Sequence, residues 1–240
     1  MRVTPTCLHT EAMTAPTDRR PRADVVYDAL LDQLTDGSLP PGVPLSINAL
    51  ARDFAVSPTP VREALSRLAL SGLVTRVPPR GYQTTPLMEP VDIQRLGEAR
   101  LLIEASLVEL AVQRNRPRVV ADLEACLAEQ RREGDSASRH RRTGEEFHRI
   151  LATAADNRFL LESYTVLGGH IERFRVQSAT GSYDHIAAVA EHEAILDAVR
   201  RGDARGAGDA MRRHLELADA RTLRALDRVL SPETSETRGG

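Results

Sequence analysis

The sequence predicts a mainly α-helical protein made of two modules of different character. Between Val25 and Thr85, short helical patterns are followed by a pair of β-like segments, whereas the pattern from Pro90 onward is almost purely helical. The charge divides in the same way. Residues 51–80 contain five Arg and two acidic residues, while the chain from Pro90 carries 23 Arg and 25 acidic residues. A small basic module therefore precedes a larger, slightly acidic one.

The composition excludes several classes of protein. Of the 240 residues, 41% are hydrophobic and 28% are charged, which disfavours collagen-like, disordered and disulfide-scaffold chains. Cys7 and Cys126 lie far apart, so a disulfide framework or a thiolate zinc site is not expected. No apolar run approaches the ~20 residues that span a bilayer, and the N-terminus lacks the apolar segment of a signal peptide. We therefore expect a cytoplasmic protein that has no membrane span.

Two prolines, Pro86 and Pro90, bracket the expected link between the modules. Met13 is an alternative start to Met1. The expected organisation is a disordered leader at residues 1–22, a first module at 23–86, a second module at 90–230 and a disordered tail at 231–240.

Apolar residues at helical spacing predict three helices in the first module: Ala23–Asp36, Ile47–Phe54 and Thr59–Ser71. Ser46 and Ser57 are expected to cap the second and third helices. Pro58 suits the first position of the third helix, where a missing N–H is harmless. Gly37 and Gly72 are expected to end the first and third helices.

The rest of the first module predicts turns and strands. Leu39–Pro44 is expected to be a rigid turn, because it is rich in Pro and Gly. Leu73–Arg76 and Gly81–Thr85 are typical of two short strands around the loop Val77–Arg80. The order helix, helix, tight turn, helix and β-hairpin is that of a winged helix-turn-helix.

The third helix and the hairpin carry Arg side chains suited to DNA. We expect Arg62 and Arg67 to point outward, where they could reach the major groove and flanking phosphates. Arg76 and Arg80 lie on the hairpin, which could reach a minor groove. The alternative is that these side chains only solvate a surface, but the agreement of cap, turn and wing signals favours DNA binding.

The segments ALARDFAVSPTPVREALSRLA (residues 49–69), SGLV (71–74) and RGY (80–82) resemble the GntR family of bacterial transcription regulators. The resemblance implies that Arg62 contacts DNA, with Ser57 and Thr59 at the helix start and Arg80 and Gly81 at the wing tip. Two departures mean that an operator sequence cannot be carried over: Pro58 stands where many members have Arg, and Asn48 where some have Arg or Glu.

The second module is predicted to be an all-α bundle of about six helices. Gly168 and Gly169 fall inside the fourth of them and indicate a kink or a close approach of another segment. The predicted helices are Val91–Arg114, Arg118–Glu133, Ser138–Ala155, Arg158–Gln177, Tyr183–Arg201 and Ala204–Leu230.

Polar residues next to apolar faces are the candidates for a site in this bundle. His148, His192 and His214 lie on three separate predicted helices and could converge on one divalent ion of the Zn, Ni or Mn class. Arg100 and Glu104 are four residues apart. The alternatives are a metal-free polar pocket for the histidines and a surface ion pair for Arg100 and Glu104.

Residues 90–230 resemble the FCD-type ligand-binding domain of the FadR subfamily. The resemblance implies a metal site at His148, His192 and His214 and an effector site at Arg100 and Glu104, with Arg100 facing a ligand carboxylate. The subfamily pattern has an Asp four residues before the first of these histidines, but Gly144 stands there. Glu145 is rotated by roughly 100° around the helix and is a poor substitute.

These features predict a transcription regulator, most often a repressor in the family it resembles. It would bind a palindromic double-stranded DNA operator as a homodimer and respond to a small carboxylate-type effector. Two alternatives are a metal-dependent small-molecule hydrolase fused to a DNA-binding module and an architectural DNA binder without an effector. The absence of HExxH, GxSxG or phosphate-loop motifs argues against an enzyme.

Overall fold

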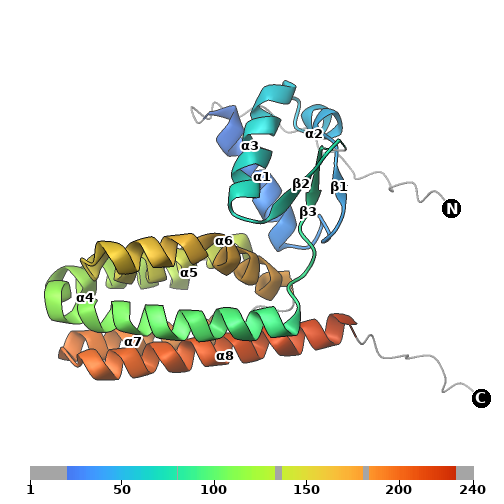
Figure 1. Cartoon of the computed structure of the whole chain (residues 1–240). Helices are drawn as coiled ribbons and strands as arrows, with labels where there is room; N and C mark the ends of the chain where they lie inside the picture. Colours follow the sequence, from blue (N-terminus) through green and yellow to red (C-terminus); the bar gives the residue numbers. More distant parts are fainter. Residues whose placement is uncertain (1–20, 80, 133–136, 181–183, 231–240) are drawn as a thin grey trace, which may run out of the picture.

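The computed structural model describes residues 21–79, 81–132, 137–180 and 184–230. It contains a small module with three helices and a sheet, and a larger module of long helices (Figure 1). The predicted fold class, a winged helix-turn-helix followed by an all-α bundle, is confirmed.

The first module has its helices and strands in the predicted order. The three strands form an antiparallel sheet of order β1-β3-β2. Val61, Leu65 and Leu68 of the third helix are fully buried against Leu30 of the first, so one apolar face of each helix forms the core. The elements are α1 (Arg22–Thr35), β1 (Pro44–Leu45), α2 (Ile47–Asp53), α3 (Pro58–Leu70), β2 (Val74–Val77) and β3 (Gly81–Thr84).

Strand β1 was missed, because Leu39–Pro44 was expected to be only a turn. The buried Thr84 of β3 aligns this segment: its Oγ1 donates to the carbonyl of Pro40 at 2.6 Å and accepts from the N–H of Val43 at 2.7 Å. A strand of two residues is too short to show an alternating pattern in the sequence.

The two predicted serine caps have different outcomes. The Ser46 side chain accepts from the N–H of Ala49 and caps α2 as expected. Ser57 occupies the N-cap position of α3, but its side chain makes no capping hydrogen bond. Pro60 stands three residues after Ser57 and has no N–H, which removes one of the two donors that an N-cap side chain ordinarily accepts from.

The second module is a bundle of long helices. The first two predicted helices are the two halves of α4, separated by Asn115, whose φ of −137° and ψ of 28° are not helical. Pro117 interrupts the hydrogen bonding of the helix at this point, and the Asn115 side chain donates to the carbonyl of Ala154 at 2.9 Å. The helices are α4 (Pro90–Arg132), α5 (Ala137–Ala154), α6 (Arg158–Thr180), α7 (His185–Arg201) and α8 (Ala204–Leu230).

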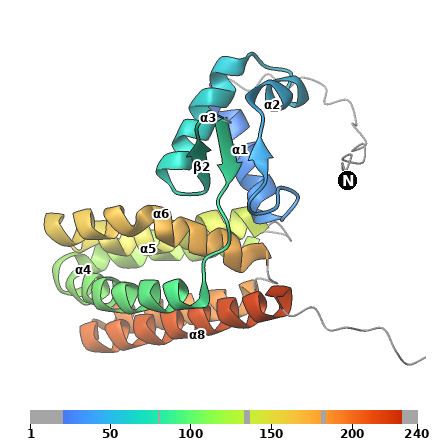
Figure 2. The same ribbon diagram turned by 45° about the vertical axis from the view of Figure 1, so that its right-hand side comes forward.

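The winged module packs against α5 and α6, while α8 runs along the far side of α4 (Figures 1 and 2). Val176 of α6 belongs to the hydrophobic cluster of the winged module. The Gln177 carboxamide accepts from the N–H of Met88 at 2.7 Å, which fixes the linker against α6. Two helices of the bundle and the linker therefore hold the winged module in place.

Gly169 is the point of closest approach between the modules. A Cβ atom at Gly169 would lie 3.1 Å from the carbonyl carbon and oxygen of Ser71, at the C-terminal end of α3, whereas a Cβ at Gly168 would meet nothing within 4 Å. Of the two possibilities given for this glycine pair, the structure shows the close approach.

This difference predicts opposite outcomes for two neighbouring substitutions. Gly168→Ala should raise the free energy of unfolding by up to ~1 kcal/mol, because Ala is the better helix former. Gly169→Ala should not raise the free energy of unfolding, because its Cβ would force α6 away from Ser71 and offset the better helix propensity of Ala. Urea denaturation of both full-length variants measures the difference, and equal stabilisation would show that the modules do not approach each other here.

Candidate metal and effector site

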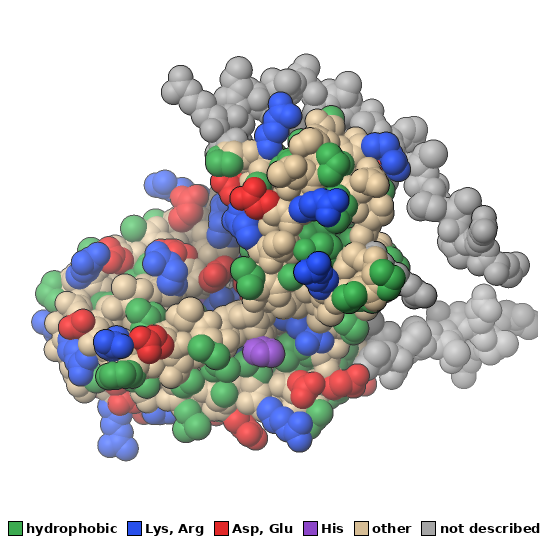
Figure 3. Space-filling model, turned by 45° about the horizontal axis from the view of Figure 1, so that its top comes forward, with side chains coloured by type: hydrophobic (Ala, Val, Ile, Leu, Met, Phe, Trp, Pro, Cys, Tyr) green, Lys and Arg blue, Asp and Glu red, His purple; other side chains and the backbone are tan. Residues whose placement is uncertain are grey.

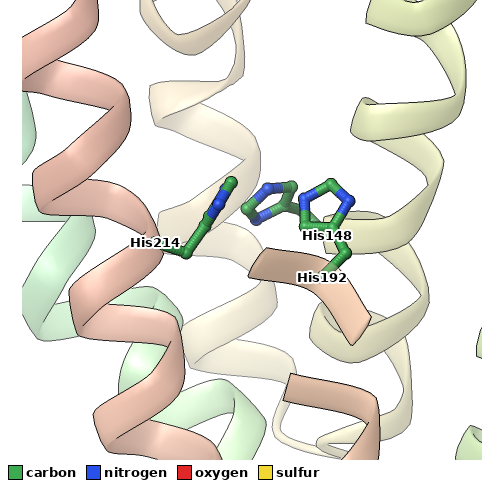
Figure 4. A group of neighbouring side chains, drawn as sticks. All are labelled: His148, His192 and His214. Atoms are coloured by element: carbon green, nitrogen blue, oxygen red, sulfur yellow. The ribbon is translucent and has the colours of Figure 1, made fainter. Parts of the chain in front are cut away.

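The three histidines singled out in the sequence lie together inside the bundle. His148 on α5, His192 on α7 and His214 on α8 are buried, and one ring nitrogen of each lies within 4.8 Å of the others. Figure 4 shows the three rings turned toward a common point. The ring of Phe147 stacks on His192 with centroids 4.0 Å apart, which closes the cluster on one side.

Hydrogen bonds determine which nitrogen of each ring is available. The Nδ1 atom of His148 lies 2.5 Å from a Glu104 oxygen, and that of His214 lies 2.8 Å from a Glu191 oxygen. The Nδ1 of His192 lies 3.1 Å from Oε1 of Gln130, whose amide nitrogen donates to the carbonyl of Thr143. All three partners are acceptors, so each Nδ1 carries the proton and each Nε2 keeps a free lone pair.

Glu104 is shared between His148 and Arg100. Its second oxygen accepts from Nε of Arg100 at 2.7 Å, and both side chains of this pair are only 3% exposed. The alternative of a surface ion pair is therefore wrong. Burial by itself would raise the pKa of Glu104, but the charge of Arg100 and the hydrogen bond with His148 hold that pKa well below its usual range.

Burial keeps the imidazoles neutral. It lowers the pKa of His148 to about 3, although Glu104 acts in the opposite direction. Burial also lowers the pKa values of His192 and His214. Metal ions bind neutral imidazole, so all three rings are in the ligating form at neutral pH.

This donor set fits a divalent ion. Each ring brings one nitrogen within 4.8 Å of the others, and the acceptors on the Nδ1 atoms leave Nε2 as the free ligating atom, as is usual for ligating histidines. The Nε2 of His192 is buried and has no hydrogen-bond partner in the described part of the chain. Gly144 offers no side-chain donor, and Glu145 lies 3.5 Å from Arg141 instead of joining the histidines. An ion held here would keep open positions, as imidazole-bound Zn, Ni or Mn can.

The cavity beside the histidines is lined with cationic groups. Arg100, Arg141, Arg175 and Arg221 contribute to its wall, together with Gly144. Of these, only Arg100 and Gly144 were singled out in the sequence. Arg141 precedes His148 by seven residues and Arg221 follows His214 by seven, so each shares a helix face with its histidine. The seven-residue spacing from a candidate histidine is the sequence signal by which Arg141 and Arg221 could have been predicted.

Most of the described residues expected to contact DNA are exposed. Ser57, Thr59 and Arg62 are exposed at the start of α3, and Arg76 is exposed on β2. Gly81 begins β3 with a φ of 99°, a conformation that favours glycine. Arg80 lies outside the described residues. Figure 3 shows Arg side chains spread over the winged module, with few acidic groups between them.

Arg67 differs from the other expected DNA contacts because it turns toward α1. Its Nη1 lies 2.5 Å from Oδ1 of Asp24, and its guanidinium lies 4.3 Å from the ring centroid of Tyr27. The side chain is still 42% exposed. These contacts connect α3 to α1, and they occupy a guanidinium donor of Arg67 that could otherwise donate to a DNA phosphate.

Comparisons with known proteins agree with this two-module arrangement. Residues 22–83 match the model of the bacterial regulatory proteins of the gntR family, and residues 95–217 match that of the FCD domain. An HTH-type transcriptional regulator in an unstable DNA locus of Streptomyces ambofaciens is 33% identical over 205 residues, which cover 84% of this chain and 85% of that protein. The HTH-type transcriptional repressor GlaR of Escherichia coli is 26% identical and covers 79% of this chain and 90% of its own length.

Solved structures share the fold. A GntR transcriptional regulator from Rhodococcus sp. RHA1 is 25% identical with a TM-score of 0.64, over 85% of this chain and 98% of that one. McbR/YncC of E. coli also has a TM-score of 0.64, at 21% identity, over 86% of this chain and 99% of that one.

The fold and the site define a DNA-binding regulator whose second module binds a ligand. The chain belongs to the GntR family of transcription regulators with an FCD domain. The family and the names of the relatives are those of regulators, so the hydrolase alternative receives no support. In the part of the chain that the structure describes, no helix is long and apolar enough to cross a membrane.

The acidic residue next to Arg100 gives a pH-dependent prediction. Burial raises the pKa of Asp219 to about 6, although Arg100 acts against this rise. A group whose pKa is higher in the folded than in the unfolded chain supports folding at low pH and loses that contribution as the pH rises through the folded value. As the pH rises from about 4 to about 7, the free energy of unfolding of the wild type should therefore decrease relative to that of Asp219→Asn. At pH 7.5 the Asp219→Asn variant should be the more stable by about 1 kcal/mol.

Thermal and urea unfolding across this pH range test the prediction. Asp227→Asn, at an exposed position of the same helix, is the matched control. A difference between wild type and Asp219→Asn that does not change with pH would contradict it.

Proposed function

We propose that this protein is a metal-assisted, acid-responsive transcription regulator that binds its operator as a dimer. The observation that carries the proposal is the cluster of three buried histidines, each with its Nδ1 held by an acceptor, beside a cavity lined with guanidinium groups. A cationic cavity next to an open metal position is suited to a small organic acid.

The DNA-binding half of the proposal rests on α3 and the hairpin. The exposed N-terminal end of α3 would enter the major groove, with Arg62 reaching phosphates or base edges. Arg76, Arg80 and Gly81 on the wing would lie over the neighbouring minor groove. Because Arg67 is engaged by Asp24 and Tyr27, we assign it a smaller part in DNA binding than Arg62. Two copies of the winged module would read the two halves of a palindrome.

The effector half rests on the histidines and Arg100. A divalent ion held by His148, His192 and His214 would supply a Lewis-acidic position, which an effector carboxylate could fill in place of the missing Asp at Gly144. Arg100 would bind the same anion, because its Nη1 is buried and has no partner among the described residues. Glu104 would hold Arg100 and His148 in place throughout.

The signal would pass through α5 and α6. Arg141 and Arg175 of these helices line the cavity, while Gly169 and Val176 of α6 contact the winged module. A shift of either helix on binding the acid would change how α1 and α3 are held, and so the population competent for DNA. We infer that the protein represses transcription and that the acid releases it from the operator. The name of GlaR as a transcriptional repressor supports this direction of regulation.

The DNA contact is tested by Arg62→Ala. We expect it to weaken specific operator binding by about 1–3 kcal/mol at fixed salt, because an exposed guanidinium contact is lost while the core beneath α3 is unchanged. Arg158→Ala, at an exposed position of α6, is the control and should leave the affinity unaltered. An Arg62→Ala variant that binds the operator as tightly as wild type would exclude α3 as the reading helix.

The metal site is tested by calorimetric titration of the full chain with Zn²⁺ and Ni²⁺. His192→Ala should weaken binding by at least ~100-fold, more than the loss of an outer hydrogen-bond partner. His170→Ala is the control, because His170 is exposed on α6 outside the triad. Gly144→Asp should tighten binding, because a carboxylate at this cavity-lining position adds charge and a ligand. Metal uptake that is the same in His192→Ala and wild type would rule out the triad as the metal site.

A further inference from the structure

More cationic groups line the cavity than one carboxylate can use. Arg100, Arg141 and Arg175 each present a buried guanidinium nitrogen that has no hydrogen-bond partner in the described part of the chain: Nη1, Nε and Nη2, respectively. The side chains of Arg100 and Arg141 are 3% and 5% exposed, so water does not readily satisfy these donors. Buried donors without partners are costly, and their grouping around one cavity indicates an absent acceptor.

The orphaned donors lie at two separate places. Arg100 lies beside the histidines, because Glu104 bonds both to it and to His148. Arg141 precedes His148 by seven residues on the same face of α5, which places its backbone ~10 Å farther along the helix axis. Arg175 of α6 lies between these two places, because its charge acts on Glu104 and His148 as well as on Glu172, the partner of Arg141. A single carboxylate at the histidines cannot satisfy the donors at both places.

Carboxylates compensate most of the cationic groups around the cavity. Glu104 and Glu191 compensate Arg100 and Arg221, and Glu172 compensates Arg141. No carboxylate oxygen of the described residues lies within salt-bridge distance of Arg175. The more exposed Glu145 reaches Arg141 only at 3.5 Å. Asp184 also lines the cavity, and Glu145, Glu172 and Glu104 act on Arg175 from farther away. The evidence for a second anion is therefore the unpartnered Nη2 of Arg175 and Nε of Arg141.

We propose that the effector carries two anionic groups, one bound beside the histidines and Arg100 and the other bound by Arg141 and Arg175. This inference rests on the proposed function of the same cavity and specifies its ligand class as a short diacid. The second group is an anionic oxygen cluster, either carboxylate or phosphate. Arg141 would receive it through Nε, because its Nη1 is occupied by Glu172.

The experiment compares ligands that differ only in the second anion. The full-length protein, loaded with Zn²⁺, is titrated calorimetrically with the dicarboxylates from malonate to adipate, with their monomethyl esters and with ω-phosphonocarboxylates of matched length. For at least one length, the diacid should bind about 10- to 100-fold more tightly than its monomethyl ester, because the ester lacks charge-assisted bonds to Arg141 and Arg175. Preference for the carboxylate or the phosphonate arm identifies the second group.

Two variants assign the preference to residues. Arg141→Met combined with Glu172→Gln removes both charges of the buried pair and leaves only the more exposed Glu145 without its arginine partner. Arg175→Met acts independently on α6. Each should abolish most of the preference for the diacid and change the affinity for the monomethyl ester by less than ~3-fold. Arg131→Met, which removes a surface pair with Glu193, should retain the full preference.

The outcomes separate this inference from the proposed function. Equal affinity for diacid and monomethyl ester at every length would overturn the second anionic site and leave the acid-responsive function standing. A preference that survives in both variants would overturn the assignment to Arg141 and Arg175. Binding of none of these acids, with or without Zn²⁺, would overturn the proposed function together with the inference.

Discussion

The cavity depends on carboxylates that each hold one histidine and one arginine. Glu104 accepts from His148 and Arg100, and Glu191 accepts from His214 and Arg221 at 2.8 and 2.6 Å. Burying a carboxylate is costly unless it is fully hydrogen-bonded, and these double contacts offset that cost. In return, each Glu fixes the tautomer of a histidine and the direction of a guanidinium, so one interaction prepares both a metal ligand and an anion donor.

This arrangement lies within the bundle, next to the helices that support the winged module. The cavity is formed between helices of the bundle, and two of them, α5 and α6, also support the winged module. Arg175 lines the cavity, while its neighbour Val176 packs into the hydrophobic core of the winged module. A ligand that draws Arg175 inward would therefore act directly on a residue that α1 and α3 rest against. The close approach at Gly169 leaves little room for such a shift to be absorbed.

The sequence predicted the fold well, because helix periodicity and glycine ends are local signals. It also singled out the three histidines, Arg100 and Glu104. It did not predict β1, whose pairing depends on the distant Thr84. It also did not predict that the Ser57 side chain makes no capping hydrogen bond, although Pro60 takes away one of the donors for such a bond. Gln130, Glu191 and Arg175 were missed for a related reason: their roles come from contacts between helices, which no spacing within one helix reveals.

The central claim is that the three Nε2 atoms form a metal site prepared by their Nδ1 hydrogen bonds. Crystals of the full chain grown with Zn²⁺, with diffraction recorded on both sides of the zinc absorption edge, test it most directly. The account predicts one anomalous peak ~2.1 Å from Nε2 of His148, His192 and His214, with Glu104, Gln130 and Glu191 still on the Nδ1 atoms. No peak at this point, or coordination through Nδ1 with those hydrogen bonds broken, would contradict it.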